Sequence, residues 1–309
     1  MRYVMLLPLL LLISGCDRMK APELAVQNAN SRVVLAEDPW VDAVRLVAGD
    51  AFSCLLWKGS IECWGDNQYG QLDVPENLVH ATDISAGDAH ACAVNDGRVV
   101  CWGNDAAGQA TPPALNDVSM VAAGAAHSCA LAQAKVVCWG SNQAGQTKVP
   151  ADLGTVELIA AGKSKTCAAT SRDITCWGNL NRTEPLRLLD INNPVALSIG
   201  SAQLCGIYNQ GMFCRNIETN EEMDSPKRFE PVALSSRHAR NCMISPSGLD
   251  CWDADGKLAT GKKGKGDIRA VAVGGKHVCA LYQERVICWG KSAKKGADVL
   301  TPPARWQGE

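Results

Sequence analysis

Fourteen of the fifteen cysteines fall into seven pairs with a single spacing. Within every pair the two cysteines are nine residues apart, and the first members of successive pairs are 37 or 38 residues apart. The pairs are Cys54 and Cys63, Cys92 and Cys101, Cys129 and Cys138, Cys167 and Cys176, Cys205 and Cys214, Cys242 and Cys251, and Cys279 and Cys288. A fixed period of this length marks a repeat architecture, in which each copy buries its core against its neighbours.

The sequence around the cysteines predicts one β-hairpin per copy. In the second copy, Asp96-Gly97 separates two short β-prone runs, and glycine tolerates the positive φ that a two-residue hairpin turn demands. Counting outward from this turn places Cys92 opposite Cys101 in a non-hydrogen-bonded pair, with Cα atoms about 4.5 Å apart, a distance that a disulfide spans. We therefore expect every pair to close its own hairpin.

Two alternatives exist for the paired cysteines. Structural zinc sites use C-x2-4-C spacing with four ligands, which eight intervening residues fit badly, and the other alternative is free buried thiols. Fifteen cysteines in 309 residues are many for a reducing cytosol, so an oxidising compartment favours disulfides over both.

The repeat length predicts the fold class. Upstream of most hairpins a further apolar run ends in a glycine, as in Ile84 to Gly87, which gives three strands per copy with room for a short fourth. Seven such units spread over residues 40–309 predict an all-β, seven-bladed β-propeller with one intra-blade hairpin disulfide per blade, and a monomer. An open solenoid is the structural alternative, but it needs atypical end repeats.

The N-terminus predicts export and lipidation. Residues 1–15 combine Arg2 with an apolar run about half as long as a membrane-spanning helix, which is typical of a signal peptide. The tetrapeptide ending in Cys16 resembles the processing box of bacterial lipoproteins, in which that cysteine carries the lipid. A soluble signal peptide cleaved nearby is the alternative. The predicted location is the bacterial cell envelope, lipid-anchored and facing the periplasm, with no choice between the inner and the outer membrane.

Residues 16–39 predict a flexible tether between the lipid and the propeller. This segment contains two prolines, no glycine and no aromatic residue, and it shows no sustained period of 2 or 3.6. A short packed arm around Arg32 to Leu35 is the alternative.

The repeat resembles that of the regulator of chromosome condensation family. The resemblance rests on Gly, then His-x-Cys-Ala, then Val-x-Cys-Trp-Gly-x-Asn-x-x-Gly-Gln, with the best match in copies two and three, and it spans about residues 41 to 303. The short repeats are more similar to a bacterial branch that includes a secreted propeller-type inhibitor of β-lactamases. The resemblance implies a non-catalytic binding scaffold whose loops on one face grip a protein partner. Copies four to seven lose the Gly-Gln, and copy six has Arg237 in place of the strand-end glycine, so these loops have either decayed or been reshaped for a partner.

Charged residues late in the chain are the candidate partner-binding residues. They form a bipolar rim of lysines and glutamates, for which ordinary solvated loops are the alternative: Lys257, Lys262, Lys263, Lys294, Lys295, Glu221 and Glu222. A formal net charge of −2 argues against a nucleic-acid binder. We expect no cofactor and no metal, because only three copies carry a histidine before the cysteine (His90, His127 and His277).

The sequence therefore predicts a non-enzymatic, membrane-tethered propeller that binds an envelope or secreted protein, as an inhibitor or immunity protein would. Catalytic motifs such as G-x-S-x-G and H-E-x-x-H are missing from the sequence. The alternatives are a constitutive envelope scaffold and a polysaccharide-active propeller enzyme.

Overall fold

The computed structural model describes residues 24–26, 32–35, 44–208, 211–224, 231–253, 267–291 and 298–307. Cys16 and the lysines predicted to bind a partner lie outside these residues. Within the described part of the chain, no helix is both long and apolar enough to cross a membrane.

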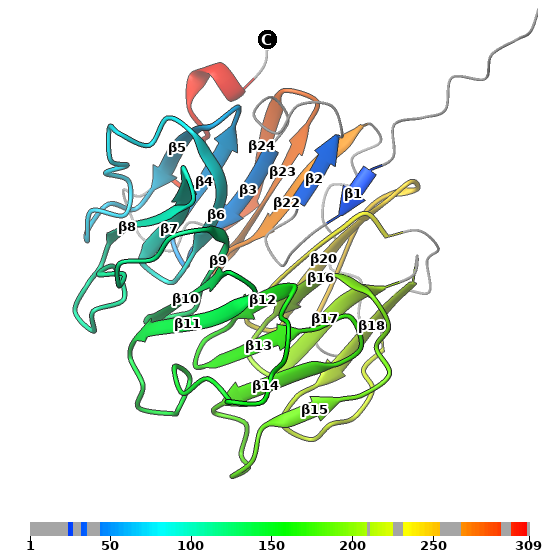
Figure 1. Ribbon diagram of the computed structural model, residues 1–309. Coiled ribbons are helices and arrows are strands. Elements are labelled where there is room, and N and C mark those ends of the chain that lie inside the picture. Colours follow the sequence, from blue (N-terminus) through cyan, green and yellow to red (C-terminus); the bar gives the residue numbers. More distant parts are fainter. Residues whose placement is uncertain are drawn as a thin grey trace, which may run out of the picture.

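Seven antiparallel sheets follow one another along the chain, one per cysteine pair (Figure 1). The first strands are β3 (Val44–Ala48), β6 (Ala81–Ala86), β9 (Val118–Ala123), β12 (Leu158–Ala161), β16 (Pro194–Ile199), β19 (Ala233–Arg237) and β22 (Ile268–Val273). The second strands are β4 (Phe52–Trp57), β7 (His90–Asn95), β10 (His127–Ala132), β13 (Lys165–Ala169), β17 (Gln203–Tyr208), β20 (Arg240–Ser245) and β23 (His277–Tyr282). The third strands are β5 (Ser60–Gly65), β8 (Arg98–Gly103), β11 (Lys135–Gly140), β14 (Ile174–Gly178), β18 (Gly211–Asn216), β21 (Gly248–Trp252) and β24 (Arg285–Gly290).

The sheets close into a ring through their first strands. Each first strand contacts that of the next sheet, and β22 of the last sheet contacts β3 of the first. Figure 1 shows the same closure, with blue β3 beside the orange strands of the last sheet. The predicted seven-bladed β-propeller is confirmed.

Three short elements add to the repeat. Blade four has a fourth strand, β15 (Leu186–Leu188), paired with β14. Two N-terminal strands, β1 (Leu24–Val26) and β2 (Arg32–Leu35), extend the first sheet, because β2 pairs with the beginning of β3. Both lie within the stretch predicted to be a tether. A 3-10 turn, η1 (Ala304–Trp306), follows the last blade.

All seven predicted hairpin disulfides are present. The Cα atoms of each pair are 4.0 to 4.1 Å apart, and the register around Cys92 and Cys101 is the predicted one, down to Asn95 opposite Arg98. The turn residues Asp96 and Gly97 have φ of 49° and 72°, as the turn chemistry requires. Local turn chemistry thus sets the register, and the register brings the sulfur atoms together.

The hydrophobic core lies between blades more than within them. One buried cluster joins Phe52 and Leu56 of blade one to Ile84 and Trp102 of blade two, and the other clusters likewise join neighbouring blades. At about 25 cal/mol per Å² of buried apolar surface, these contacts are the main favourable contribution to ring formation. Each blade therefore depends on both neighbours.

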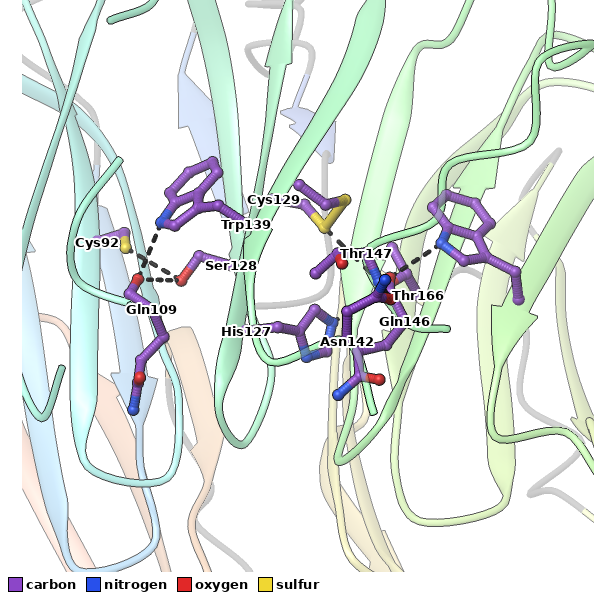
Figure 2. Close-up of a disulfide and its surroundings, with 12 residues drawn as sticks. Cys92, Gln109, His127, Ser128, Cys129, Trp139, Asn142, Gln146, Thr147 and Thr166 are labelled. Atoms are coloured by element: carbon purple, nitrogen blue, oxygen red, sulfur yellow. Dashed lines mark hydrogen bonds between the residues drawn. A yellow bond between two sulfur atoms is a disulfide. The ribbon is translucent and has the colours of Figure 1, made fainter. Parts of the chain in front are cut away.

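Hydrogen bonds reinforce the junctions at repeating positions. The Trp139 indole N–H donates to the Gln109 carbonyl oxygen (3.0 Å) of the loop before it (Figure 2). Trp102 and Trp177 donate in the same way to the carbonyl oxygens of Gln71 and Gln146. The recurring tryptophan is thus the donor, and the backbone carbonyl of the recurring glutamine the acceptor, of one inter-blade hydrogen bond. Trp64 of blade one donates instead to Val299 (3.1 Å), which follows the last blade.

Candidate binding surface at the channel mouth

The turns between first and second strands all lie on one face of the ring, around one end of the central channel. We call this end the channel mouth. The turn in each blade has a variable residue two positions before the second strand. In chain order this residue is Asp50, Asp88, Ala125, Lys163, Ser201, His238 or Gly275, and the turn begins with the residue just before it. That preceding residue is a glycine in six blades and Arg237 in blade six. The framework therefore repeats while the rim residues differ.

The glycines are required because the blades approach one another closely here. A Cβ atom on Gly124 would lie 2.4 Å from the Gly162 carbonyl oxygen of the next blade and 2.2 Å from the ring of its own His127. Both distances are too short for any side chain. Glycine at this position therefore permits the close approach of neighbouring blades.

Three buried histidines form hydrogen bonds between neighbouring blades beneath this face. The Nε2 atom of His127 lies 3.0 Å from the Thr166 hydroxyl of the next blade, and Figure 2 shows the ring directed toward it. The hydroxyl itself donates to the Gln146 carbonyl oxygen (2.8 Å), so Nε2 carries the proton and donates. His90 and His277 reach Ser128 (2.9 Å) and Ser53 (2.8 Å) in the same manner.

These histidines are held neutral. Burial lowers the pKa of His90, His127 and His277 to about 4, because the charged imidazolium would lose its water. Their Nδ1 atoms have no hydrogen-bond partner among the described residues, so an added proton would have nothing to bind. The described residues contain no group of three potential metal ligands.

Arg237 crosses the channel mouth from blade six to the opposite side of the ring. Its guanidinium donates to the carbonyl oxygens of Ala48 (3.2 Å) and Ala86 (3.4 Å), and it pairs with the Asp88 carboxylate at 2.5 Å. An arginine fits because the position that holds a buried histidine in blades two, three and seven is Arg240 here, and Arg240 is partly exposed. In blade six the close glycine contact is thus replaced by an arginine side chain that reaches across the channel mouth.

Acidic and basic groups share the rim beside Arg237. The Asp50 carboxylate lies 3.4 Å from His238 Nε2, and this hydrogen bond, with help from Arg237, lowers the pKa of Asp50. Asp50 and Asp88 are about half exposed and lie on adjacent turns joined by the Asp50 N–H and the Asp88 carbonyl (3.0 Å). The mouth therefore presents fixed, partly exposed charges to whatever binds there.

Of the sequence-predicted partner residues, only the glutamates can be placed. Glu221 and Glu222 are exposed and follow β18. The backbone of Glu222 forms an isolated antiparallel β-bridge with that of Arg215. The neighbouring Glu218 pairs with Lys165 of blade four at 2.8 Å. The acidic group therefore lies across the junction of blades four and five. Nothing in the described residues brings it to the predicted lysines.

Sequence reasoning missed the inter-blade partners of the histidines and the reach of Arg237. The sequence held a signal for the histidine partners. Copies two and three have a histidine two residues before the cysteine, and the copy after each has serine or threonine one residue before its own cysteine; copy seven has the same relation to copy one once the ring is closed. Where Phe52 replaces the histidine, the next copy has Ala91 instead.

Comparison with known proteins supports the fold. Residues 81–109 and 118–146 match the family described as regulator of chromosome condensation (RCC1) repeat. No curated protein sequence matches the chain. The ectodomain of the Physcomitrella patens receptor kinase CR4 is similar in structure, with a TM-score of 0.61 and 22% identity over 79% of this chain and 71% of that one.

Two further solved structures show the same architecture. The ectodomain of the Arabidopsis thaliana receptor kinase ACR4 has a TM-score of 0.53 and 24% identity over 69% of this chain and 79% of that one. Yeast RCC1 (Prp20) has a TM-score of 0.57 and 15% identity over 79% of this chain and 82% of that one. The chain is thus a seven-bladed β-propeller similar in fold to yeast RCC1, and the matches to the RCC1 repeat lie in its second and third blades.

Proposed function

We propose that this chain is a non-enzymatic propeller that binds an envelope or secreted protein through the face around the channel mouth. The observation that carries the proposal is the contrast between a framework that repeats from blade to blade and a rim that does not. Cystines, glycines and inter-blade hydrogen bonds hold the turns in place, while the rim residues include acids, a lysine and a histidine. A rigid platform loses little conformational entropy on binding.

The fold comparison agrees with protein binding. Yeast RCC1 was crystallised with Kap60 bound to it. A ring of this kind offers a broad surface of turns, and complementary charges on such a surface increase the rate and the specificity of association. Several mixed charges fit a protein partner better than a small substrate.

We further propose that the chain acts at the bacterial envelope, anchored by a lipid on Cys16, and that it inhibits or neutralises its partner. The signal-like residues 1–15, the cysteine at position 16 and the wealth of cystines support this location. The similarity of repeat length to a secreted inhibitor of β-lactamases supports an inhibitory role.

Affinity purification of the lipidated full-length chain from envelope extracts tests both parts. A partner recovered with the wild type is purified, and its dissociation constant is measured against Asp50→Ala, Asp88→Ala and the combined Lys257→Ala, Lys294→Ala, Lys295→Ala variant. Arg172→Ala, an exposed change on the opposite face, is the control. We expect weaker, less salt-sensitive binding for the two aspartate variants and for the lysine variant, and unchanged binding for Arg172→Ala.

Unchanged affinity and salt dependence in both Asp50→Ala and Asp88→Ala would overturn the assignment of the binding face. Membrane fractionation of Cys16→Ala tests the anchor separately: the variant should leave the membrane fraction, and its retention there would contradict lipidation at Cys16.

A further inference from the structure

A small polar cavity lies beneath Arg237 where the seven first strands end. Its volume is about 40 Å³, and residues of every blade line it, among them Ser85, Ser198, Ser235, Ser236 and Arg237. A buried water needs about 10–15 Å³ measured in this way. The cavity therefore has room for about three waters or for one group of similar size.

Two hydrogen-bond donors at this cavity lack acceptors within the described part of the chain. The Nε atom of Arg237 and the hydroxyl oxygen of Ser236 are both buried and have no partner there. Leaving a buried donor unpaired is costly, and more so when the donor belongs to a charged group. Both residues line the cavity, so a ligand inside it can accept from both.

The charges around the cavity favour an anion. The ionised groups of its lining are Arg237, Lys163 and Asp88, which leave one positive charge in excess, and His238 adds to it when protonated. Asp88 balances the charge of Arg237 through a contact with its Nη2 atom, which leaves Nε on the cavity side. The positive field of Arg237 extends further, because it contributes to lowering the pKa of His90 and of His277.

The geometry points to a binding site for a single carboxylate group, held by Arg237 Nε and the Ser236 hydroxyl at the channel mouth. Arginine recognises planar carboxylates through parallel N–H donors, and charge-assisted hydrogen bonds of this kind are among the strongest in proteins. The small volume admits the carboxylate group but not the rest of a larger molecule. The carboxylate comes either from a free small acid or from an aspartate or glutamate side chain that a protein inserts.

The site does not depend on the proposed function, because a free acid alone would occupy it. It depends on Arg237, which the sequence places in one blade only, at a position where the other six have glycine. Arg237→Gly therefore restores the common residue of the repeat and keeps the turn. Ser236→Ala removes the second donor and leaves the arginine in place.

Saturation-transfer NMR with sodium formate as the probe tests the site on the full-length oxidised chain. We expect formate to bind the wild type, with at least about tenfold weaker binding in Arg237→Gly and clear weakening in Ser236→Ala. Arg187→Ala is the matched control, since it also removes an arginine paired with an aspartate, Asp152, but on the outer edge of blade four. Circular dichroism verifies that each variant is folded.

A second titration, with N-acetylglutamate amide, separates the two sources. Binding of formate alone assigns the site to free small acids, whereas binding of both probes, again dependent on Arg237, shows that a protein side chain can enter. The absence of binding by either probe, or binding that Arg237→Gly leaves unchanged, overturns the proposal. A crystal structure grown with formate that shows only water at Arg237 Nε overturns it as well.

Discussion

Each of the three buried histidines is neutral because burial disfavours the charged imidazolium, and each makes a hydrogen bond through Nε2 to a hydroxyl of the next blade. The Thr166 hydroxyl accepts from His127 and donates to Gln146, so it links two blades with one atom. Thr166→Val keeps the shape of the side chain but leaves the buried His127 N–H without an acceptor. We expect a loss of about 1–3 kcal/mol in the free energy of unfolding, measured with urea at pH 7.5.

Thr183→Val is the control for this substitution, because Thr183 is exposed in the loop before β15. Its effect should stay within about 0.5 kcal/mol. Equal losses in the two variants would show that the hydroxyl of Thr166 contributes nothing beyond its volume.

The same histidines predict how stability depends on pH. Their pKa is about 4 in the folded chain and about 6.5 when unfolded, so the unfolded chain binds more protons between these values. Stability is therefore fully present above pH 6.5 and falls as the pH drops toward 4. At 1.36 kcal/mol per pKa unit, each histidine contributes up to about 3 kcal/mol to this loss.

Urea unfolding from pH 7.5 to 4 measures this dependence. The variant with glutamine at positions 90, 127 and 277 is the comparison, since Gln203 already occupies the corresponding position in blade five. We expect a shallower loss in the triple variant. Identical pH dependence in the two proteins would mean that other groups cause the acid sensitivity.

At the scale of the hairpin, each cystine closes a loop of the same length. In the chain-entropy account, a loop of this size stabilises the folded state by about 2–3 kcal/mol. Replacing Cys129 and Cys138 together with alanine should lower the free energy of unfolding by that amount and increase amide exchange in β10 and β11. Removing Cys242 and Cys251 serves as the control, because the loop is equally long but its turn differs.

Equal losses at the two sites would support the entropic origin of the stabilisation. A loss well below 1 kcal/mol at both sites would show that the bridges add little to hairpins already held by their neighbours.

The hairpin is also the scale at which the sequence was most informative. The partner of Cys92 follows from the turn at Asp96-Gly97, because the contact lies nine residues away and one turn determines it. The contacts of Arg237 with Ala48 and Asp88 could not be predicted, since they depend on the diameter of the closed ring. The Thr166 contact lies between these cases: its spacing of 39 residues is visible only once neighbouring copies are known to be adjacent.

At the scale of the whole molecule, the first and last blades meet at the closure of the ring, and no described strand of one pairs with a strand of the other. The C-terminal segment holds them together: buried Trp306 packs against Trp57 of blade one with ring centroids 5.3 Å apart, and its indole N–H donates to Glu62 (2.9 Å). Arg305 pairs with the same carboxylate. Residues near the C-terminus thus close the ring by contacting blade one, which comes early in the chain.

This closure predicts a large effect from a single residue. Trp306→Ala should cost about 3–5 kcal/mol of unfolding free energy, because it leaves a cavity between the last blade and the first. Trp306→Phe keeps most of the buried surface and loses the bond to Glu62, so its cost should be nearer 1 kcal/mol. Limited proteolysis should detect opening in the alanine variant first. Equal costs would contradict a packing role for the indole ring.

The most direct test of the whole account is the disulfide map of the mature, purified protein. Non-reducing proteolysis at acidic residues between the cysteine pairs, followed by mass spectrometry, should recover seven bridges, each joining cysteines nine residues apart, and no free thiol among these fourteen. Bridges between cysteines of different blades, or a reduced pair in the exported protein, would contradict a ring of seven self-closed hairpins.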